Sequence, residues 1–385
     1  MNYVGTARPI HDAKGKATGY TKYAGDLSLP NMAYLCMLHS KIPHGYVKAV
    51  HAEKALALPG VYGVYHCLNT SDRKYNRYRS SFNQAYLANE ERAFNQYVRF
   101  VGDKIGVVAA CDQETAERAA RLVEVEYEEL PFSIGFDDTL AGKNCLEGET
   151  PVRDEYTLEV GKKQESTEGL IEVCSTMELP RLHHATMETH ACIADYDPYS
   201  DMLTVYCPNQ AVHGIRTVLA DFLEMPESHV RVVKATMGGS FGAKQEWFLE
   251  PVTALVAKKL CRPVKLVYSR GEAMTDTIVR GAMRMSARGY YTPDGEMKEI
   301  YCDVTLDAGA YIGNAGDYVR ALAGKPTRCY RIPYMHYHGQ VISSNSPVSG
   351  AFRSWSAAEE ALMMERQLDA AAEKLGICLL YTSDA

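Results

Sequence analysis

Residues 230–245 read VRVVKATMGGSFGAKQ, a β-branched segment that runs directly into a glycine-rich turn. The first part, through Ala235, has the composition of a strand. Gly238, Gly239 and Gly242 permit positive φ angles and would let a ligand approach the backbone closely. The stretch therefore predicts a strand that ends in a binding turn.

The segments on either side of this turn alternate between strand and helix patterns. Residues 203–207 alternate apolar and polar side chains, and a helix with one apolar face is predicted from about residue 211. After the turn come a second helix, over about residues 246–260, and a strand over residues 264–268. This alternation is typical of an α/β unit, although the pattern does not decide whether the strands pair in parallel.

Three polar or glycine-rich junctions, at residues 208–210, 238–245 and 350–353, each lie between an extended segment and the start of a helix. In α/β proteins such junctions face a common crevice, where free backbone N–H groups attract anions. Three ordinary turns would be the alternative. The glycine turn is not a Walker A loop, because Gln245 follows Lys244 and the glycine spacing is wrong. The residues alone thus predict a crevice for a phosphate-bearing or anionic ligand.

The N-terminal half has a different pattern, typical of an α+β domain. Residues 98–130 read as strand, helix and strand, with Asp112 as the helix N-cap. Residues 132–169 show little periodicity and are interpreted as a linker or a wrapping segment. A last helix is predicted from Ser356, with a capping box to Glu359 and a stop at Gly376.

Composition excludes several classes of protein. The 385 residues carry a formal charge of −7, without the basic surplus that nucleic-acid binding needs. No apolar run is long enough to cross a membrane, and the start of the chain does not read as a signal peptide. The eleven cysteines form no C-x-x-C pair, which favours reduced thiols in a cytoplasmic protein and argues against an iron–sulfur cluster in this chain.

Several motifs resemble the molybdenum-binding subunit of the xanthine dehydrogenase/aldehyde oxidase family. They are MGGSFGAKQ at residues 237–245, HATMETHACIA at 184–194 and GAFR at 350–353. Residues 8–27 and 41–55 resemble the a/b-hammerhead domain of that family. The resemblance implies an α+β chain, with a hammerhead domain over residues 1–135, a linker over 136–169 and the first, incomplete part of an α/β molybdopterin-binding domain over 170–377.

The same resemblance implies roles for individual residues. Gln210 would lie beside the molybdenum and hydrogen-bond an oxo ligand, Gln245 would neighbour the substrate, and Arg320 would bind it. A surface arginine in a loop is the alternative for Arg320. The cofactor-binding set would be Gln210, Gly239, Ser240, Phe241, Gly242, Ala351, Phe352 and Arg353. No protein side chain of this chain is expected to ligate a metal.

Two departures from the family pattern stand out. Ser354, Trp355 and Ser356 follow GAFR, where the family has glycine, an aromatic residue and glycine. The chain also ends before the catalytic glutamate and the second cofactor-binding domain that the resemblance implies. Residues 378–385 (CLLYTSDA) break the pattern and are interpreted as a non-native tail. We therefore expect a truncated fragment that is inactive alone.

The function implied by the resemblance is hydroxylation of purine-type N-heterocycles, such as xanthine or hypoxanthine, with water as the oxygen source. The cofactor would be a molybdenum-pyranopterin. Iron–sulfur clusters and FAD would reside on two partner subunits. The alternatives are an aldehyde oxidoreductase of the same family and, on the glycine turn alone, a phosphate- or nucleotide-binding module without redox activity.

Overall fold

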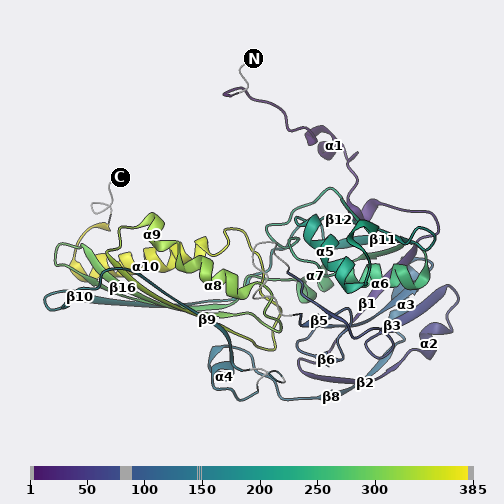
Figure 1. Cartoon of the computed structure of the whole chain (residues 1–385), viewed down its shortest axis with the longest axis horizontal. Coiled ribbons are helices and arrows are strands. Elements are labelled where there is room, and N and C mark those ends of the chain that lie inside the picture. Colours follow the sequence, from purple (N-terminus) through teal and green to yellow (C-terminus); the bar gives the residue numbers. More distant parts are fainter. Residues whose placement is uncertain (1–3, 79–88, 145, 147, 149, 380–385) are drawn as a thin grey trace.

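The computed structural model describes residues 4–78, 89–144, 146, 148 and 150–379, and Figure 1 shows them as two lobes side by side. One lobe contains β1, β11, β12, α5 and α6, and the other contains β9, β10, β16, α8 and α10. An N-terminal arm with helix α1 (Ala13–Ala17) extends away from the first lobe. Of the predicted tail, residues 380–385 lie outside the described residues.

The first lobe is built on a mixed seven-stranded sheet. Its order is β13 (Val230–Lys234), β12 (Met202–Cys207), β11 (Ala191–Asp197), β14 (Val264–Val267), β1 (Ala33–His39), β7 (Lys104–Ala110) and β3 (Val61–His66). Strands β12 and β13 pair in parallel, and so do β14 and β1. The β14–β1 pairing joins strands from the two halves of the chain, so one sheet crosses the predicted linker between the domains.

Helices pack on this sheet through their apolar faces. Helix α5 (Val212–Phe222) packs on β13, α6 (Glu250–Leu260) packs on β11, and α3 (Gln113–Ala120) packs on β1 and β7. The smaller elements of this lobe are α2 (Glu53–Leu56), α7 (Arg270–Asp276), the 3-10 turns η1 (Ala24–Asp26) and η2 (Glu227–His229), the sheet of β6 (Tyr97–Val98), β2 (Gly45–His51) and β8 (Glu124–Glu129), and the pair β4 (Lys74–Tyr75) and β5 (Glu91–Arg92).

The second lobe is a five-stranded sheet. Its order is β10 (Ile171–Leu179), β15 (Met283–Tyr291), β16 (Met297–Asp307), β17 (Tyr334–Ile342) and β9 (Val152–Gly161). Helix α10 (Ala357–Leu375) packs on β10 and β15, and α8 (Ala315–Ala323) packs on β17 and β9. The short helices are α9 (Pro326–Cys329) and α4 (Phe136–Leu140).

Residues 136–169, interpreted as a linker or a wrapping segment with little periodicity, contain a regular strand. Strand β9 lies inside this segment and pairs along its whole length with β17. Tyr156, Leu158 and Val160 alternate with polar residues and pack against the core of this lobe. Gly, Asp, Lys and Glu residues elsewhere in the segment masked this period of two.

The predicted helix ends have mixed outcomes. The Asp112 side chain accepts a hydrogen bond from Thr115 N at 2.7 Å, and Gly376 ends α10 in the left-handed region, so both predictions are confirmed. The capping box at Ser356 is wrong, because this residue has a φ of 63° and its side chain makes no capping hydrogen bond. Among the described residues, none of the helices has the length and apolar character that crossing a bilayer requires.

Candidate cofactor site

The structure brings the three predicted junctions together. Gln210 N donates to Lys244 O at 2.8 Å, which ties the end of β12 to the glycine turn. Arg353 N donates to Phe241 O at 2.7 Å, which ties the same turn to residues 350–353. These main-chain bonds show that the three junctions lie side by side.

The side chain of Gln210 is oriented by the glycine turn. Its Oε1 accepts a hydrogen bond from Ser240 Oγ at 2.6 Å. Ser240 Oγ in turn accepts from Lys244 N at 3.1 Å, so the hydroxyl is fixed between the two junctions. The amide nitrogen of Gln210 has no protein acceptor within the described residues. Gln210 therefore presents an oriented N–H donor to a ligand.

The glycine turn offers further donors from its backbone. The N–H groups of Gly239, Ser240 and Phe241 have no protein acceptor in the part of the chain that the structure describes. A Cβ on Gly242 (φ +107°) would lie 2.3 Å from Ala351 O, whereas the space next to Gly239 (φ +99°) is open to 3.6 Å. Successive free N–H groups around open space form a nest for an anionic group. These residues therefore fit a pyranopterin phosphate.

A buried ion pair holds the glycine turn in place. Glu188 Oε2 accepts from Gly238 N at 2.7 Å and from Lys244 Nζ at 2.6 Å. The Lys244 side chain is almost fully buried, and burial lowers its pKa. Lys244 thus holds the turn rather than facing the ligand.

Residues 350–353 are fixed from the opposite side. The Phe352 ring stacks on His184, with ring centroids 4.2 Å apart, and Arg280 lies 4.3 Å over the same ring. His184 Nε2 contacts Ala351 O at 2.8 Å. Burial lowers the pKa of His184 to about 4. The imidazole is therefore neutral at pH 7, and it donates Nε2–H to the carbonyl.

The three residues that follow GAFR, two of which replace family glycines, adopt glycine-like conformations. Ser354, Trp355 and Ser356 have φ values of 84°, 37° and 63°. Lys325 donates from Nζ to Trp355 O and, at 2.6 Å, to Ser356 Oγ. The backbone thus keeps a left-handed conformation although the family glycines are absent. Because residues with a Cβ atom rarely adopt this conformation, the backbone here is strained.

We expect Ser354→Gly to raise the free energy of unfolding by up to about 1 kcal/mol, because glycine removes the left-handed penalty at this exposed position. Urea denaturation measures the change. Ser356→Gly is the matched control and should gain less, because it also loses the bond from Lys325. A Ser354→Ala variant as stable as Ser354→Gly would contradict backbone strain as the cause.

Arg320 and Gln245 differ in their location and in their hydrogen-bond partners. The backbone N of Gln245 donates to Gly242 O at 3.0 Å, which places it at the end of the glycine turn. Arg320 lies on α8, and its two terminal nitrogens donate to Asp154 at 2.6 and 2.9 Å. The pairing of Asp154 with Arg320 was not expected, and nothing in the strand pattern around Asp154 indicates an ion pair with a helix so distant in sequence.

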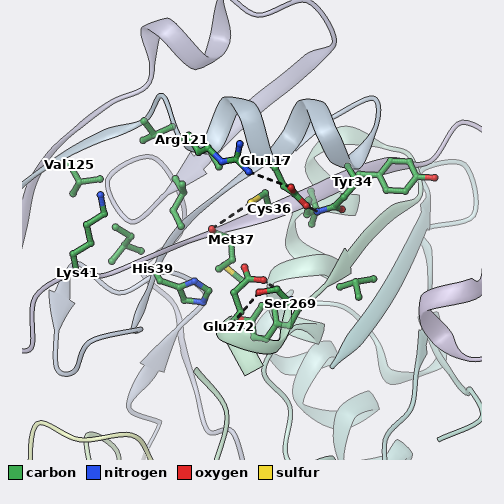
Figure 2. Close-up of a pocket in the computed structure, with 18 of the residues that line it drawn as sticks. Tyr34, Cys36, Met37, His39, Lys41, Glu117, Arg121, Val125, Ser269 and Glu272 are labelled. Atoms are coloured by element: carbon green, nitrogen blue, oxygen red, sulfur yellow. Dashed lines mark hydrogen bonds and ion pairs between the residues drawn. The ribbon is translucent and has the colours of Figure 1, made fainter. Parts of the chain in front are cut away.

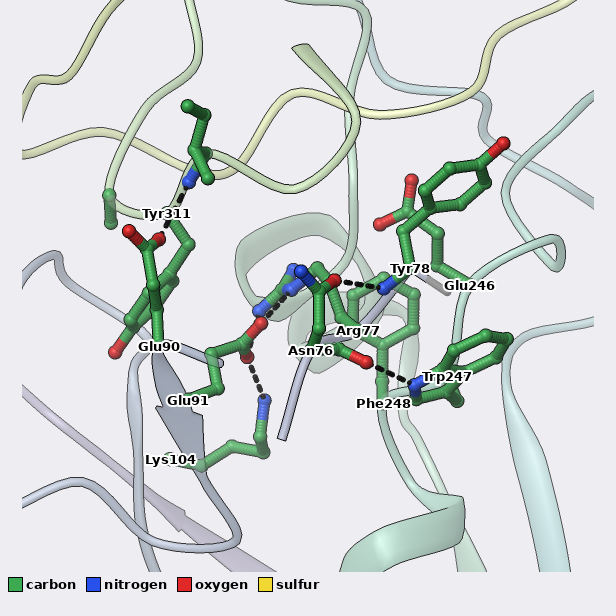
Figure 3. Close-up of polar contacts among 12 residues, drawn as sticks. Asn76, Arg77, Tyr78, Glu90, Glu91, Lys104, Glu246, Trp247, Phe248 and Tyr311 are labelled. Atoms are coloured by element: carbon green, nitrogen blue, oxygen red, sulfur yellow. Dashed lines mark hydrogen bonds and ion pairs between the residues drawn. The ribbon is translucent and has the colours of Figure 1, made fainter. Parts of the chain in front are cut away.

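Glu246 is a second residue that the sequence did not single out. It is 1% exposed, and burial raises its pKa to about 8. Its main-chain O accepts from Asn209 Nδ2 at 3.0 Å, next to Gln210. The charges that act on its carboxyl group include Arg77 and Glu91, which form the ion pair drawn in Figure 3. The residue was missed because it stands in a segment predicted to be an ordinary helix.

A groove lies elsewhere in the first lobe, between residues from both halves of the chain. This groove of about 1000 Å³ is lined by Cys36, Glu117, Arg121 and Glu272, among others (Figure 2). Burial raises the pKa of the Cys36 thiol to about 12, so the residue is not a nucleophile at neutral pH. The groove contains none of the predicted site residues.

Comparison with known proteins identifies the class to which this site belongs. Residues 149–380 match a family described as a molybdopterin cofactor-binding domain. Residues 18–131 match the aldehyde oxidase and xanthine dehydrogenase a/b hammerhead domain. The fold and the site therefore define a molybdopterin-binding protein.

Relatives and solved structures agree. The chain is 30% identical over 381 residues to the xanthine dehydrogenase molybdenum-binding subunit of Escherichia coli O157:H7, covering 95% of this chain and 49% of that protein. It is 30% identical over 370 residues to the nicotinate dehydrogenase large molybdopterin subunit of Eubacterium barkeri, covering 95% and 85%. The aldehyde oxidoreductase of Desulfovibrio gigas has the same fold, with a TM-score of 0.90 at 24% identity, covering 98% of this chain and 42% of that one.

The chain belongs to the aldehyde oxidase/xanthine dehydrogenase family of molybdopterin-binding proteins. It spans about half the length of the Escherichia coli relative. The predicted fold class, a hammerhead domain followed by a molybdopterin-binding domain, is confirmed by the two family matches. The predicted molybdopterin cofactor is confirmed at the level of the family. The assignments of individual site residues stay predictions.

Proposed function

We propose that this chain forms the cofactor site of a molybdenum hydroxylase that oxidises purine-type N-heterocycles with water as the oxygen source. The observation that carries the proposal is the convergence of Gln210, the glycine turn and residues 350–353 on one group of free donors. The similarity to a xanthine dehydrogenase subunit supports the substrate class. When bound, the molybdenum-pyranopterin would supply the two-electron oxidation of the substrate.

The protein residues would bind and orient. Gln210 would donate from its amide nitrogen to the metal centre, and the N–H groups of Gly239, Ser240 and Phe241 would hold the pterin side. Ala351, Phe352 and Arg353 would form the opposite wall. Arg320 and Gln245 would contact the substrate.

The proposal includes partners and a compartment. Since the cysteines of this chain lack cluster spacing, electrons would leave through an iron–sulfur subunit and an FAD-binding subunit. The activity would belong to this assembly, and the chain without its partners would be inactive. Reduced cysteines favour the cytoplasm as its location.

One observation favours a second candidate, an aldehyde oxidoreductase. The Arg320 guanidinium is paired with Asp154, so its charge is already compensated and its donors are partly used. Small aldehydes would not need that guanidinium. In this candidate the cofactor site is the same and only the substrate differs.

The test is metal and pterin analysis of the assembled protein from its native source, followed by assays with xanthine, nicotinate and aldehydes. Near-stoichiometric molybdenum with purine turnover is the expected result. Molybdenum with aldehyde turnover alone would favour the second candidate. A protein without molybdenum that binds nucleotides would instead be a phosphate-binding module, and the proposed function would be wrong.

Gln210→Ala in that assembly should lower kcat for every substrate and change KM little, because the amide touches the cofactor and not the substrate. Losing one oriented donor at a reacting centre typically reduces kcat by about 10²–10³. Steady-state kinetics at matched molybdenum content measure the effect. A selective change in KM for purines would place Gln210 at the substrate instead.

A further inference from the structure

Glu246 and Asn314 form a buried polar pair with two oxygen atoms left over. Asn314 Nδ2 donates to Glu246 Oε1 at 3.0 Å. The other oxygen of each side chain, Glu246 Oε2 and Asn314 Oδ1, is buried and has no partner among the described residues. The residues are 1% and 3% exposed, so bulk water does not reach them. Buried polar atoms in native proteins are rarely left unpaired.

One proton on Glu246 Oε2 would give both unpaired oxygen atoms a hydrogen-bond partner. A carboxylate only accepts hydrogen bonds, but a protonated carboxyl group carries one O–H donor. A carboxylic acid and a primary amide are complementary, since each presents one donor beside one acceptor. The observed bond from Nδ2 to Oε1 is one half of such a pair, and a proton on Oε2 would supply the other half.

We propose that Glu246 is a neutral carboxylic acid whose Oε2–H donates to Asn314 Oδ1, and that this acid–amide pair positions residues 350–353 at the cofactor site. The first part concerns the chain alone. The positioning role rests on the proposed function.

The contacts of the pair reach two of the three junctions, and Glu246 directly follows the third in sequence. Ala351 N points at Glu246 Oε1 at 3.4 Å, and a Cβ on Gly350 would lie 2.5 Å from the same oxygen. The main chain of Glu246 holds Asn209, the residue before Gln210. Asn314 stands directly before α8, the helix that carries Arg320. Glu246 is therefore a positioning residue that joins the start of α8 to residues 208–210 and 350–353.

The charged groups around Glu246 do not compensate an anion there. Arg77 favours the ionised form and Glu91 opposes it, and these two are paired with each other. Lys104 also faces Glu91, at 3.8 Å. His184 and Arg280 contact residues 350–353 from the other side. Burial dominates and raises the pKa of Glu246 to about 8.

The sign of the pH dependence follows from this shift. The unfolded chain ionises Glu246 near 4.5, whereas the folded chain keeps the proton until about pH 8. The contribution of Glu246 to stability is therefore fully present below pH 4.5 and is lost as the pH rises towards 8. Glu250, on α6, titrates in an overlapping range because burial raises its pKa to about 7.

The experiment uses the 385-residue chain without cofactor, so it does not depend on enzymatic activity. Infrared difference spectra at pH 7 should show a protonated carboxylic acid band that disappears in Glu246→Gln. This variant keeps an acceptor and a donor in the same places, so hydrogen exchange at residues 350–353 should stay within about twofold of the original chain. Its thermal stability should depend less on pH between 4.5 and 8.

Removing Asn314, the partner of Glu246, should have the opposite effect on hydrogen exchange at residues 350–353. Asn314→Leu keeps a similar volume but leaves Glu246 unpaired, so exchange at residues 350–353 should rise about tenfold or more while β15–β17 stay protected. Glu250→Gln is the matched control. It removes a second buried carboxyl group whose bonds go to Phe248 N, away from residues 350–353. Exchange at those residues should not change in this control.

Two results would overturn the proposal. If no acid band is lost in Glu246→Gln, Glu246 is ionised and the acid–amide pair does not exist. If Asn314→Leu leaves exchange at residues 350–353 unchanged, the pair does not position the segment. Failure of the proposed function would appear differently: the assembled protein from its native source would contain no molybdenum, while these exchange results would still hold.

Discussion

Glu91→Gln should destabilise the chain by about 3–5 kcal/mol, because it leaves a buried guanidinium without its counter-charge. Arg77 donates from Nε and Nη2 to both oxygens of Glu91, and both side chains are 2% exposed (Figure 3). The guanidinium also lies 4.7 Å over the ring of Phe248. Urea denaturation followed by circular dichroism measures the loss.

Two further variants show whether charge burial is the cause. The double variant Arg77→Met/Glu91→Leu removes both charges of the pair and leaves the buried Lys104 beside Asp276 at 3.5 Å, so most of the lost stability should return. Glu128→Gln is the matched surface control. It breaks the exposed 2.5 Å pair with Lys48 and should change stability by no more than about 1 kcal/mol. A double variant as unstable as Glu91→Gln would attribute the loss to packing.

Local patterns of sequence predicted much of the fold. The strand at β12, the helix at α5 and the strand at β13 were correctly placed, because each has a strong period of two or 3.6 over its own residues. The proximity of the three junctions also followed, since junctions on one edge of an α/β unit face the same side of the sheet. The family followed from motifs in series.

Pairings between distant residues could not be predicted in the same way. The β14–β1 pairing, Ala33 beside Val264, depends on the tertiary fold and not on the pattern of either strand. The same holds for Asp154 with Arg320 and for Glu246 with Asn314. Buried charged residues have no local signature, because in the sequence they resemble residues of an exposed helix face or strand edge.

Arg320→Met, in the assembled and loaded enzyme, should reduce purine oxidation by roughly a hundred- to a thousandfold, by analogy with a lost donor to developing charge, at about 2.7–4 kcal/mol. The reason is that a guanidinium meeting negative charge in a dry pocket acts mainly on the transition state. Small aldehydes should be spared, because their carbonyl group does not require this donor. Steady-state kcat/KM values on both substrate classes, at equal molybdenum content, measure the difference.

The pairing with Asp154 supplies the control for this prediction. Asp154→Asn keeps the shape of the side chain but removes the negative charge that compensates Arg320. In the original chain Arg320 Nη1 lies 2.6 Å from Asp154 Oδ2. If Arg320 binds the substrate, purine oxidation should persist in Asp154→Asn and fall only in Arg320→Met. If the pair instead only fastens α8 to β9, the two variants should lose purine and aldehyde activity alike. Equal losses would make Arg320 a structural residue, and since its compensated charge already favours the aldehyde candidate, the purine assignment would then lose its main residue.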